Sequence, residues 1–411
     1  MITKLKVIIS DTDIENHDYS LIETKKYFTY GETGFDVISV SPNDNILCTI
    51  NENRDVDVII TIGGRDNFVY RTLDTSSFQI RKKWCHFTEF QPKNIANTII
   101  NVFVNNINRK EPQNLRLFSF FTCTFNTPKE YLHRLYLSML NQTYSEWNWY
   151  VLDDSTNSSV IDTLKGFNDN RIVIYKNETN HGVIGFNKHT IAMACNGDYL
   201  VEVDHDDELT NDCLYYLNKA FDEFPETDFV YSNAYEEIGG KAVIYGNNWG
   251  WGEGMTKREI LNGTEVEFSA SPEINPFSIR TIYAQPNHVR CWKSDFYHRI
   301  GGHNISLGVL DDMDLIIRTF LHGKITKVEK ILYIQHGGKP MEMRGDTTQG
   351  HRFKEIQRTC YLLYRKYDKQ IHDRIIELGF SDYAWDEKNG CSSLNKEHIP
   401  GLEVMSNLLV V

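Results

Sequence analysis

The chain has 411 residues, enough for two or three domains, and its 41% hydrophobic and 24% charged content is typical of a globular protein. Its 43 basic and 56 acidic residues give a formal net charge of −13. This acidity excludes a general affinity for phosphate backbones, so no nucleic-acid partner is expected.

No apolar run is long enough to span a bilayer, and Asp11 and Asp13 interrupt the N-terminus before a signal-peptide core can form. The eight cysteines are scattered and include no CxxC pair, which argues against a disulfide or zinc framework. These features predict a cytoplasmic protein with reduced thiols and no membrane span.

Residues 1–112 are predicted to form a small α/β accessory domain. Three β-rich runs between residues 6 and 64 are followed by a helix-like run that ends at Arg109. Strands that alternate with helices indicate a parallel sheet. The charged, proline-containing residues 109–114 are typical of a linker to the next domain.

Residues 113–345 are predicted to form the main domain. From Leu115 onward, strands and helices alternate, and the first of these helices begins at Pro128. This pattern predicts a Rossmann-like sheet with helices on both faces and ligands at the carboxyl ends of its strands. Basic amphipathic segments after Gly350 predict that residues 346–411 form a C-terminal helical extension.

Carboxylates follow two of the predicted strands. One strand, "YLVEV", runs into Asp204, Asp206 and further acids, and another, "WYVL", runs into Asp153 and Asp154. Clustered carboxylates repel one another unless a cation such as Mg²⁺ or Mn²⁺ joins them, and such a cation bridges well to a diphosphate. The structural alternatives are a solvated loop capping the next helix for the first set and an Asx turn for the second.

A third acidic group, which includes Asp311 and Asp312, stands at a predicted helix start in "GVLDDMDLIIRTF". A carboxylate at such a position can act as a general base that removes the proton of an attacking hydroxyl. The alternative is that these acids only cap the helix and complement its dipole.

The order of these motifs resembles the inverting family-2 glycosyltransferases of GT-A fold over about Leu115 to Pro340. The similar segments are "FFTCTFNTPKEYLHRLYLSMLNQTYSEWNWYVLDDST", "NHGVIGFNKHTIAMACNGDYLVEVDHDDE" with its DxD motif, and "HVRCWKSDFYHRIGGHNISLGVLDDMDLIIRTFLHG". The resemblance implies a metal-dependent enzyme that transfers a sugar from a UDP-sugar, with Mn²⁺ or Mg²⁺, to a hydroxyl of a glycan or protein acceptor.

The resemblance also implies roles for single residues. The nucleotide-sugar would be contacted by Thr124, Asp153, Asp154, Asn180, Gly182 and Asp204. The metal would be held by Asp206 and Asp204, with Asp206 as the more direct ligand, and by His336, whose alternative is an ordinary surface histidine. Asp312 would be the catalytic base, and Asp311 would hydrogen-bond the acceptor.

The chain departs from the family pattern at two places. Lys188 stands in "GFNK" where many relatives carry Ala-Arg-Asn, and it lacks the bidentate fork of an arginine. Asp311 and Asp312 replace the commoner Glu-Asp pair, and a side chain shorter by one methylene displaces the acceptor contact. Trp249, Trp251 and Trp292 are candidate sugar-stacking platforms or core residues.

Two other functions stay open from the residues. A non-catalytic carbohydrate- or protein-binding module on a degenerate scaffold is the main alternative, because a fold does not guarantee activity. Nucleotidyl transfer would need a glycine-rich basic loop after the first strand of the main domain, where the chain reads "TCTFNTPKEY". The two flanking regions are expected to present the acceptor or to mediate self-association.

Overall fold

The computed structural model describes residues 4–13, 16–17, 34–42, 46, 49–50, 53, 56–74, 83–107, 116–244, 256–276, 278–280, 286–337 and 346–381. The chain divides into two compact units, one made of Met1–Glu111 with Ile376–Ser381 and one built on Pro112–Ile375 with Asp382–Val411. Each unit is considered by itself, and the domain limits at residues 112 and 345 stay predictions.

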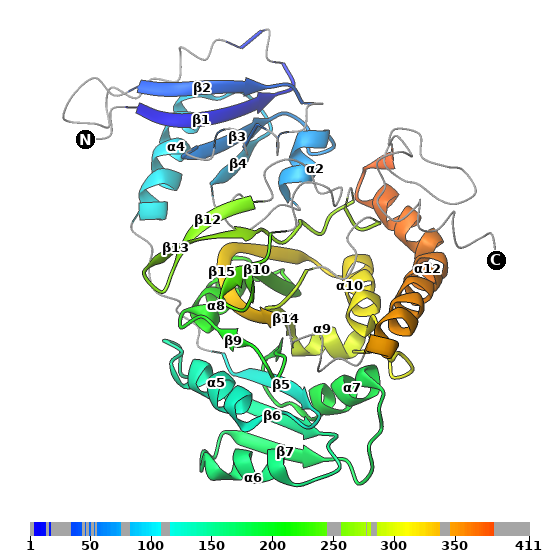
Figure 1. Ribbon diagram of the computed structural model, residues 1–411. Coiled ribbons are helices and arrows are strands. Elements are labelled where there is room, and N and C mark those ends of the chain that lie inside the picture. The colour runs from blue at the N-terminus through cyan, green and yellow to red at the C-terminus, as the bar shows by residue number, and fades with distance from the viewer. Residues whose placement is uncertain are drawn as a thin grey trace. The chain divides into compact units, whose positions relative to one another are not determined.

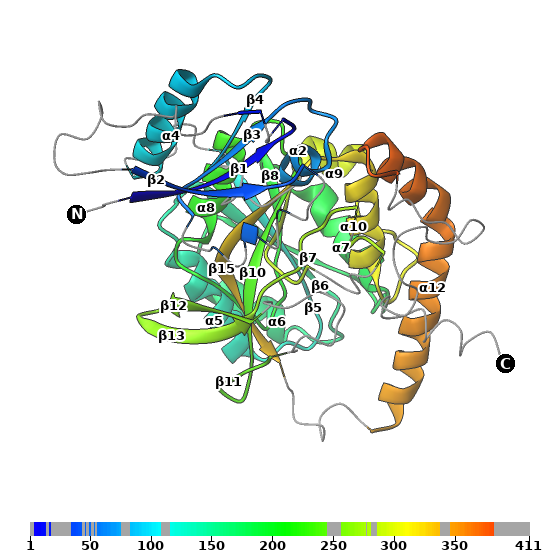
Figure 2. The same ribbon diagram turned by 90° about the horizontal axis from the view of Figure 1, so that it is seen from above.

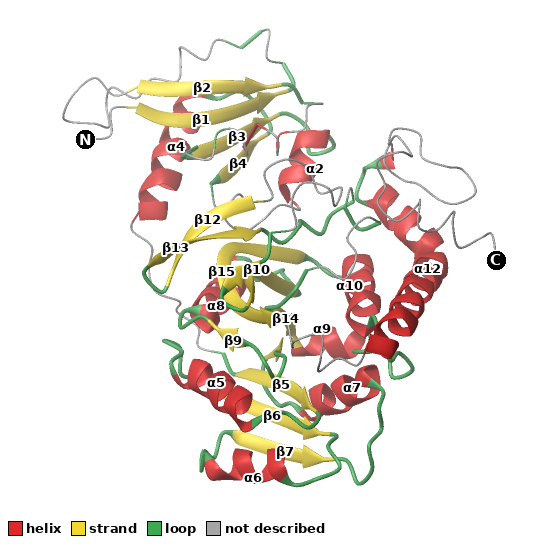
Figure 3. Ribbon diagram, in the orientation of Figure 1, coloured by secondary structure: helices red, strands yellow, loops and turns green. Residues whose placement is uncertain are grey.

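The first unit contains a parallel sheet in the order β2-β1-β3-β4. Its strands are β1 (Lys4–Asp11), β2 (Gly34–Val40), β3 (Val58–Ile62) and β4 (Trp84–Phe87), and its helices are α2 (Phe68–Asp74) and α4 (Pro92–Ile107). Alternate residues of β1 serve opposite faces: Val7 and Ile9 pack with α4, whereas Ile8 packs with α2. The predicted small α/β fold is therefore confirmed for this part of the chain (Figure 3).

The second unit is organised around a mixed sheet of nine strands among the described residues, in the order β7-β6-β5-β8-β14-β10-β15-β9, with β11 paired to β10. The strands are β5 (Phe118–Thr124), β6 (Trp147–Asp153), β7 (Ile172–Lys176), β8 (Tyr199–Glu202), β9 (Glu208–Leu209), β10 (Phe229–Ile238), β11 (Lys241–Ala242), β14 (Arg290–Lys293) and β15 (Ile325–Gly337). Strands β5 to β8 are mutually parallel, whereas β14 is antiparallel to both of its neighbours, β8 and β10. Next to them, β10 and β15 run side by side (Figure 2).

Helices cover both faces of this sheet, as predicted. They are α5 (Lys129–Leu140), α6 (Ser159–Gly166), α7 (Ile184–Ala194), α8 (Cys213–Glu223), α9 (Ser294–Arg299), α10 (Asp311–His322) and α12 (Asp346–Glu377). Figure 1 shows α5 and α8 on one side and α7, α9 and α10 on the other. In α5 the buried residues Leu132, Leu135 and Met139 recur at helical spacing, which explains why this segment folds as a helix against the sheet.

The chain after Tyr231 contributes the rest of the long strand β10 and a hairpin of β12 (Thr256–Leu261) and β13 (Thr264–Ser269). Trp249 and Trp251 lie outside the described residues, while Trp292 is fully buried and belongs to the core.

The C-terminal segments form one continuous helix, α12. It buries residues four apart, including Leu363, Tyr367 and Ile371, and the Tyr367 hydroxyl donates to Asp314 of α10 at 2.8 Å. In both views α12 lies beside α10 (Figures 1 and 2). Among the described residues, no helix is long and apolar enough to cross a membrane.

Candidate active site

Two parallel strands bring the predicted carboxylates to one edge of the sheet. β6 ends at Asp153, and β8 ends at Glu202, just before Asp204. Both strands pair in parallel with β5, so their carboxyl ends point the same way. The β14 strand runs in the opposite direction, which places Arg290 at its start directly across from Glu202.

At the end of β6, both oxygens of the Asp154 carboxylate accept hydrogen bonds from the chain itself. It accepts hydrogen bonds from Asn177 Nδ2 at 2.7 Å, from the backbone N–H groups of His181 and Gly182 at 2.8 and 3.0 Å, and from Asn187 Nδ2 at 3.0 Å. Burial alone would raise the pKa of Asp154, but these donors outweigh it and lower the pKa. The buried carboxylate therefore holds the loop between β7 and α7 in place.

Asp153 is equally enclosed. It accepts the Thr124 hydroxyl at 3.1 Å, the Ser155 hydroxyl at 2.5 Å and the Lys176 ammonium at 2.7 Å. Thr124 is itself buried. The structure thus brings Thr124 and Asp153 into contact next to Asp154 and uses their polar groups within the protein, and the expected contacts of all three with a nucleotide-sugar stay predictions.

Asn180 and Gly182 belong to the loop that Asp154 holds. Asn180 Nδ2 donates to the Asp154 carbonyl at 3.0 Å, and Gly182 has a left-handed φ of 70°, which favours glycine. Both residues are thereby fixed at the carboxyl edge of the sheet.

The carboxylates of Asp204 and Asp206, which follow β8, differ from those of Asp153 and Asp154 in their hydrogen bonding. Neither Asp204 nor Asp206 accepts a side-chain hydrogen bond from any residue that the structure describes. The nearest partners of Asp204 are Lys188 Nζ at 4.0 Å and His288 Nδ1 at 3.8 Å, and that of Asp206 is His205 Nδ1 at 3.9 Å. Their side chains remain 39% and 33% exposed, so both carboxylates are open to an external partner.

The next acid, Asp207, faces inward instead. It accepts the Tyr333 hydroxyl at 2.9 Å and the backbone N–H of His336 at 2.8 Å. Burial, together with the carboxylates of Asp204 and Asp206, raises the pKa of Asp207 to about 8. Negative charge is therefore crowded at this edge, which is the condition that a bound cation relieves.

The structure places the ring of His336 between two other carboxylates. Its Nε2 lies 2.7 Å from Glu208 and its Nδ1 lies 2.9 Å from Glu237. Both ring nitrogens are occupied in this arrangement, so His336 can ligate a metal only if one of these contacts is released. Its predicted metal role stays a prediction.

The third acidic group begins α10. Leu310, the residue before the helix, has a left-handed φ of 56°, and the helix starts directly at Asp311. Asp312 accepts Arg290 Nη2 at 2.8 Å on one oxygen and the backbone N–H of Met313 at 2.7 Å on the other. Burial alone would raise the pKa of Asp312, but the positive charges of Arg290 and Lys188 outweigh it and lower the pKa.

Asp311 differs from its neighbour. Its Oδ2 atom is buried and has no hydrogen-bond partner among the described residues, and Lys188 Nζ and His303 Nε2 each lie 3.7 Å away. Burial raises the pKa of Asp311, although the charges of Lys188 and His303 oppose the rise. Adjacent aspartates are thus held in different electrostatic environments.

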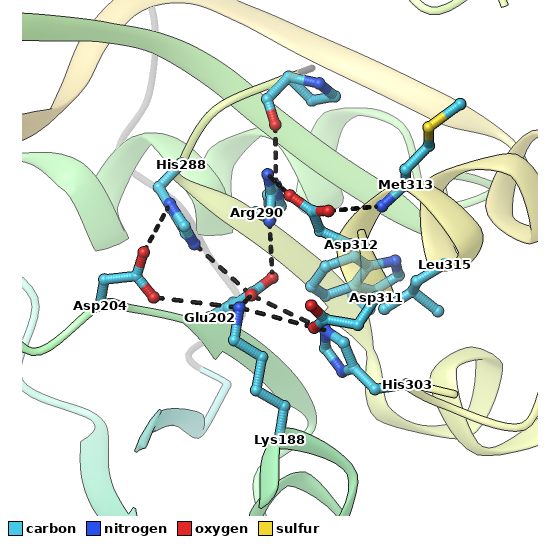
Figure 4. Close-up of polar contacts among 12 residues, drawn as sticks. Lys188, Glu202, Asp204, His288, Arg290, His303, Asp311, Asp312, Met313 and Leu315 are labelled. Carbon is cyan, nitrogen blue, oxygen red and sulfur yellow. Dashed lines mark hydrogen bonds and ion pairs between the residues drawn. The ribbon is translucent and has the colours of Figure 1, made fainter. Parts of the chain in front are cut away.

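A buried charge network links these acids, and Figure 4 shows it around Glu202. The Glu202 carboxylate contacts Lys188 Nζ at 2.5 Å and Arg290 Nη1 at 3.3 Å, and the rings of His288 and His303 lie 3.6 and 3.7 Å from it. Burial alone would raise the pKa of Glu202, but the two cations outweigh it and hold the pKa well below its usual range.

Lys188, expected to substitute for an arginine, lies among three carboxylates of the site. It reaches Glu202, Asp311 and Asp204 from α7. Burial would lower the pKa of Lys188, but these carboxylates raise it well above its ordinary value. Lys188 is therefore a fixed positive charge at the centre of the site.

Glu202, Asp204 and His288 place one potential metal-ligand atom each within 4.8 Å of one another. Glu202, however, is already neutralised by Lys188, and the two nitrogens of His288 face different carboxylates, Nδ1 toward Asp204 and Nε2 toward Glu202. Of the three, Asp204 is the residue whose charge is left open.

Sequence reasoning singled out Lys188 only as a substitute for an arginine, and it assigned no role to Glu202, Arg290, His288 or His303. A signal was present in "YLVEV", because a lone carboxylate within a buried strand requires a buried cation nearby. Nothing in the sequence identifies that cation, since Arg290 is 88 residues away and reaches Glu202 through strand pairing.

Comparison with known proteins shows that part of the chain matches a protein family. Residues 119–278 match the family model described as glycosyl transferase family 2. The chain is 25% identical over 237 residues, 55% of this chain and 75% of the relative, to the putative colanic acid biosynthesis glycosyl transferase WcaA of Escherichia coli K12. It is also 25% identical over 275 residues, 64% of this chain and 92% of the relative, to the UDP-Glc:alpha-D-GlcNAc-diphosphoundecaprenol beta-1,3-glucosyltransferase WfaP of Escherichia coli.

Among solved structures, TarS of S. aureus superimposes with a TM-score of 0.45 at 17% identity, covering 70% of this chain and 47% of that chain. The present chain thus spans about half the length of that protein. TarS 1-349 in complex with UDP-GlcNAc gives a TM-score of 0.46 at 18% identity, covering 69% of this chain and 78% of that chain. Residues 119–278 therefore match a glycosyl transferase family 2 domain, and the curated relatives that the chain resembles are glycosyltransferases.

Proposed function

We propose that the protein is a metal-dependent inverting glycosyltransferase that uses a UDP-sugar donor and a hydroxyl acceptor. The observation that carries the proposal is the pair of carboxylates after β8. Asp204 and Asp206 stand at the carboxyl edge of the sheet without a hydrogen bond to their side chains from the described residues, whereas Asp153 and Asp154 are saturated.

A divalent cation fits this pair. Mn²⁺ and Mg²⁺ prefer carboxylate oxygens, and the exposed side chains of Asp204 and Asp206 can approach such an ion without losing an existing hydrogen bond. When bound, the cation would neutralise the diphosphate of the leaving nucleotide. The residues that would hold it are Asp204 and Asp206, and His336 would join them only after it releases Glu208 or Glu237.

Asp311 and Asp312 of α10 are proposed to have different roles in the transfer reaction. Asp312, whose lowered pKa keeps it ionised near neutral pH, is the proposed base that accepts the proton of the attacking hydroxyl. Asp311 retains an oxygen that has no hydrogen-bond partner among the residues the structure describes, and Asp311 is proposed to bind the acceptor. Attack on the sugar carbon from the side opposite the diphosphate gives inversion.

The donor side is proposed to be formed by the loop that contains Asn180 and Gly182. Asp154 fixes this loop through two backbone N–H groups, and Asp153 fixes the end of β6 through Thr124 and Ser155. These acids therefore act on the nucleotide-sugar mainly by shaping its site. A UDP-sugar is supported by WfaP, whose name gives UDP-Glc as donor and of which this chain covers 92%.

The proposed acceptor is a glycan, with a protein hydroxyl as the second class. WfaP, by its name, glucosylates a GlcNAc that is carried on diphosphoundecaprenol, which supports a sugar hydroxyl as acceptor. Self-association and acceptor presentation by the flanking regions stay predictions.

The proposal is tested by a UDP-release assay with a panel of UDP-sugars in Mn²⁺, Mg²⁺ and EDTA, followed by NMR of the product. We expect release with one donor, loss of activity in EDTA and an inverted anomeric configuration. Full activity in EDTA would contradict the metal role, and a retained configuration would contradict the assignment of Asp312. Donor binding without hydrolysis or transfer would instead indicate a non-catalytic binding module.

A further inference from the structure

We propose that Arg290, anchored by Glu202, is a positioning residue that holds Asp312 in its reactive orientation. The inference rests on the proposed function, because it takes Asp312 as the base. It goes beyond that function by assigning a role to the buried Arg290–Glu202 ion pair.

The guanidinium of Arg290 is fixed on three sides. Nε donates to the carbonyl of Pro286 at 2.8 Å, Nη1 to Glu202 at 3.3 Å and Nη2 to Asp312 at 2.8 Å. Only 3% of the residue is exposed. A planar guanidinium whose three nitrogens all donate hydrogen bonds cannot rotate freely. It therefore fixes the orientation of the Asp312 carboxylate that it binds.

Asp312 is held but not enclosed. One oxygen meets Arg290 and the other meets the N–H of Met313, yet 22% of the side chain remains exposed. Such a carboxylate is oriented by the protein while it stays accessible to an acceptor. By contrast, Asp314, two residues further along the helix, is fully buried and hydrogen-bonded by Arg318 and Tyr367.

Glu202 makes this arrangement possible. An arginine buried this deeply needs an anionic partner, and Glu202 lies directly across from Arg290 in the paired strands. Glu202 also binds Lys188, which faces Asp311 at 3.7 Å and Asp204 at 4.0 Å. One buried carboxylate therefore orients both cations that face the reacting groups.

The charges around Asp312 have opposite effects on it. Arg290 from β14 and Lys188 from α7 favour its ionised form, whereas Glu202 from β8 and Asp311 from its own helix oppose it. The rings of His288 and His303 lie 3.6 and 3.7 Å from Glu202. Removing Arg290 should raise the pH at which Asp312 takes up a proton, and removing the charge of Glu202 should lower it.

The experiment compares Arg290→Gln, Arg290→Lys and Glu202→Gln in the full chain, with UDP release as the activity. For Arg290→Gln we expect kcat to fall on the order of 100-fold, because a displaced base loses its alignment. The donor KM should change less than about threefold, and the acid limb of the kcat profile should move to higher pH. Arg290→Lys should restore part of kcat and return the limb toward that of the wild type.

Arg318→Gln is the matched control, since Arg318 donates to Asp314 on the same helix at 2.8 Å. It removes a buried arginine–aspartate pair without touching Asp312. An equal loss of kcat in Arg318→Gln, with an unmoved acid limb in Arg290→Gln, would overturn the positioning role. The melting temperature of each variant, measured with and without UDP in the presence of Mn²⁺, verifies that the variant is folded and binds the nucleotide.

Asp312→Asn separates this inference from the proposed function. If Asp312→Asn retains activity, the proposed base is wrong regardless of Arg290. If Asp312→Asn is inactive but Arg290→Gln and Glu202→Gln behave like the wild type, the assignment of Asp312 as the base is supported and the positioning role of Arg290 is contradicted. The expected outcome is that Asp312→Asn is inactive and that the acid limb moves in opposite directions in Arg290→Gln and Glu202→Gln.

Discussion

The ends of β6 and β8 look alike in the sequence and differ in the folded protein. Each strand runs from apolar residues into neighbouring aspartates at the same edge of the sheet. At the end of β6, Asp154 receives four hydrogen bonds from one loop and its helix. At the end of β8, Asp204 and Asp206 receive none to their side chains from the described residues.

This contrast shows that position at a strand end does not by itself decide what a carboxylate does. A carboxylate that is saturated by protein donors stabilises a loop, because its charge is already satisfied. A carboxylate without donors keeps its charge for an external cation. The first two predictions below test this distinction directly.

The largest effect is expected from removing the charge of the open carboxylates. Asp204→Asn and Asp206→Asn should each lower kcat by roughly 100-fold or more, since the leaving diphosphate loses its neutralising cation. The melting temperature should change little because no hydrogen bond is lost. Asp295→Asn, at an exposed position of α9, is the control and should keep both activity and stability. A large drop in melting temperature for Asp204→Asn would place it with Asp154 instead.

The reverse pattern is expected at Asp154. Asp154→Ala leaves the amide of Asn187 and two backbone N–H groups without their acceptor in a buried position, which should lower the free energy of unfolding by about 3 kcal/mol. Urea unfolding followed by circular dichroism measures this change. The donor KM should rise as the loop loosens, and an unchanged free energy of unfolding would contradict the structural role.

A smaller effect is expected at Gly185, where α7 meets the loop before α10. A Cβ at Gly185 would lie 2.2 Å from the carbonyl oxygen of Asn304 and 2.8 Å from that of Leu307. Gly185→Ala should therefore push α7 away from that loop and destabilise the protein by about 1–3 kcal/mol. Because α7 carries both Asn187 and Lys188, activity should fall as well.

The control for this change is Gly166→Ala at the end of α6, where an added Cβ meets no atom within 4 Å. It should leave stability unchanged or raise it by up to about 1 kcal/mol, because alanine favours the helix. If Gly185→Ala had the same free energy of unfolding as Gly166→Ala, α7 could shift without loss of stability, and the prediction would be contradicted.

Much of this picture follows from the sequence. Strand and helix periodicity predicts β5 to β8 with their intervening helices, and the acids at Asp204 and Asp312 stand out as groups at element ends. Local patterns also predict that Asp153 and Asp154 lie at the sheet edge. They do not reveal that Asn177, His181 and Asn187 donate hydrogen bonds to the Asp154 carboxylate, because such contacts depend on the path of a loop.

The buried network was missed for a related reason. Glu202, Arg290 and Lys188 come from three elements, β8, β14 and α7, and meet only through the antiparallel pairing of β14 with β8 and the packing of α7. The sequence shows that Glu202 needs a cation, and only the register of the strands identifies Arg290. Likewise, the rings of His336 and His288 acquire their partners from tertiary contacts alone.

The most direct test of the account is calorimetric titration of the protein with UDP in the presence of Mn²⁺ and, separately, of EDTA. If Asp204 and Asp206 hold a cation that bridges to the diphosphate, UDP should bind at least about tenfold more tightly with Mn²⁺, a difference of about 1.4 kcal/mol. Asp206→Asn should abolish that gain. Equal UDP affinity in Mn²⁺ and EDTA, or a full Mn²⁺ effect in Asp206→Asn, would contradict the central claim.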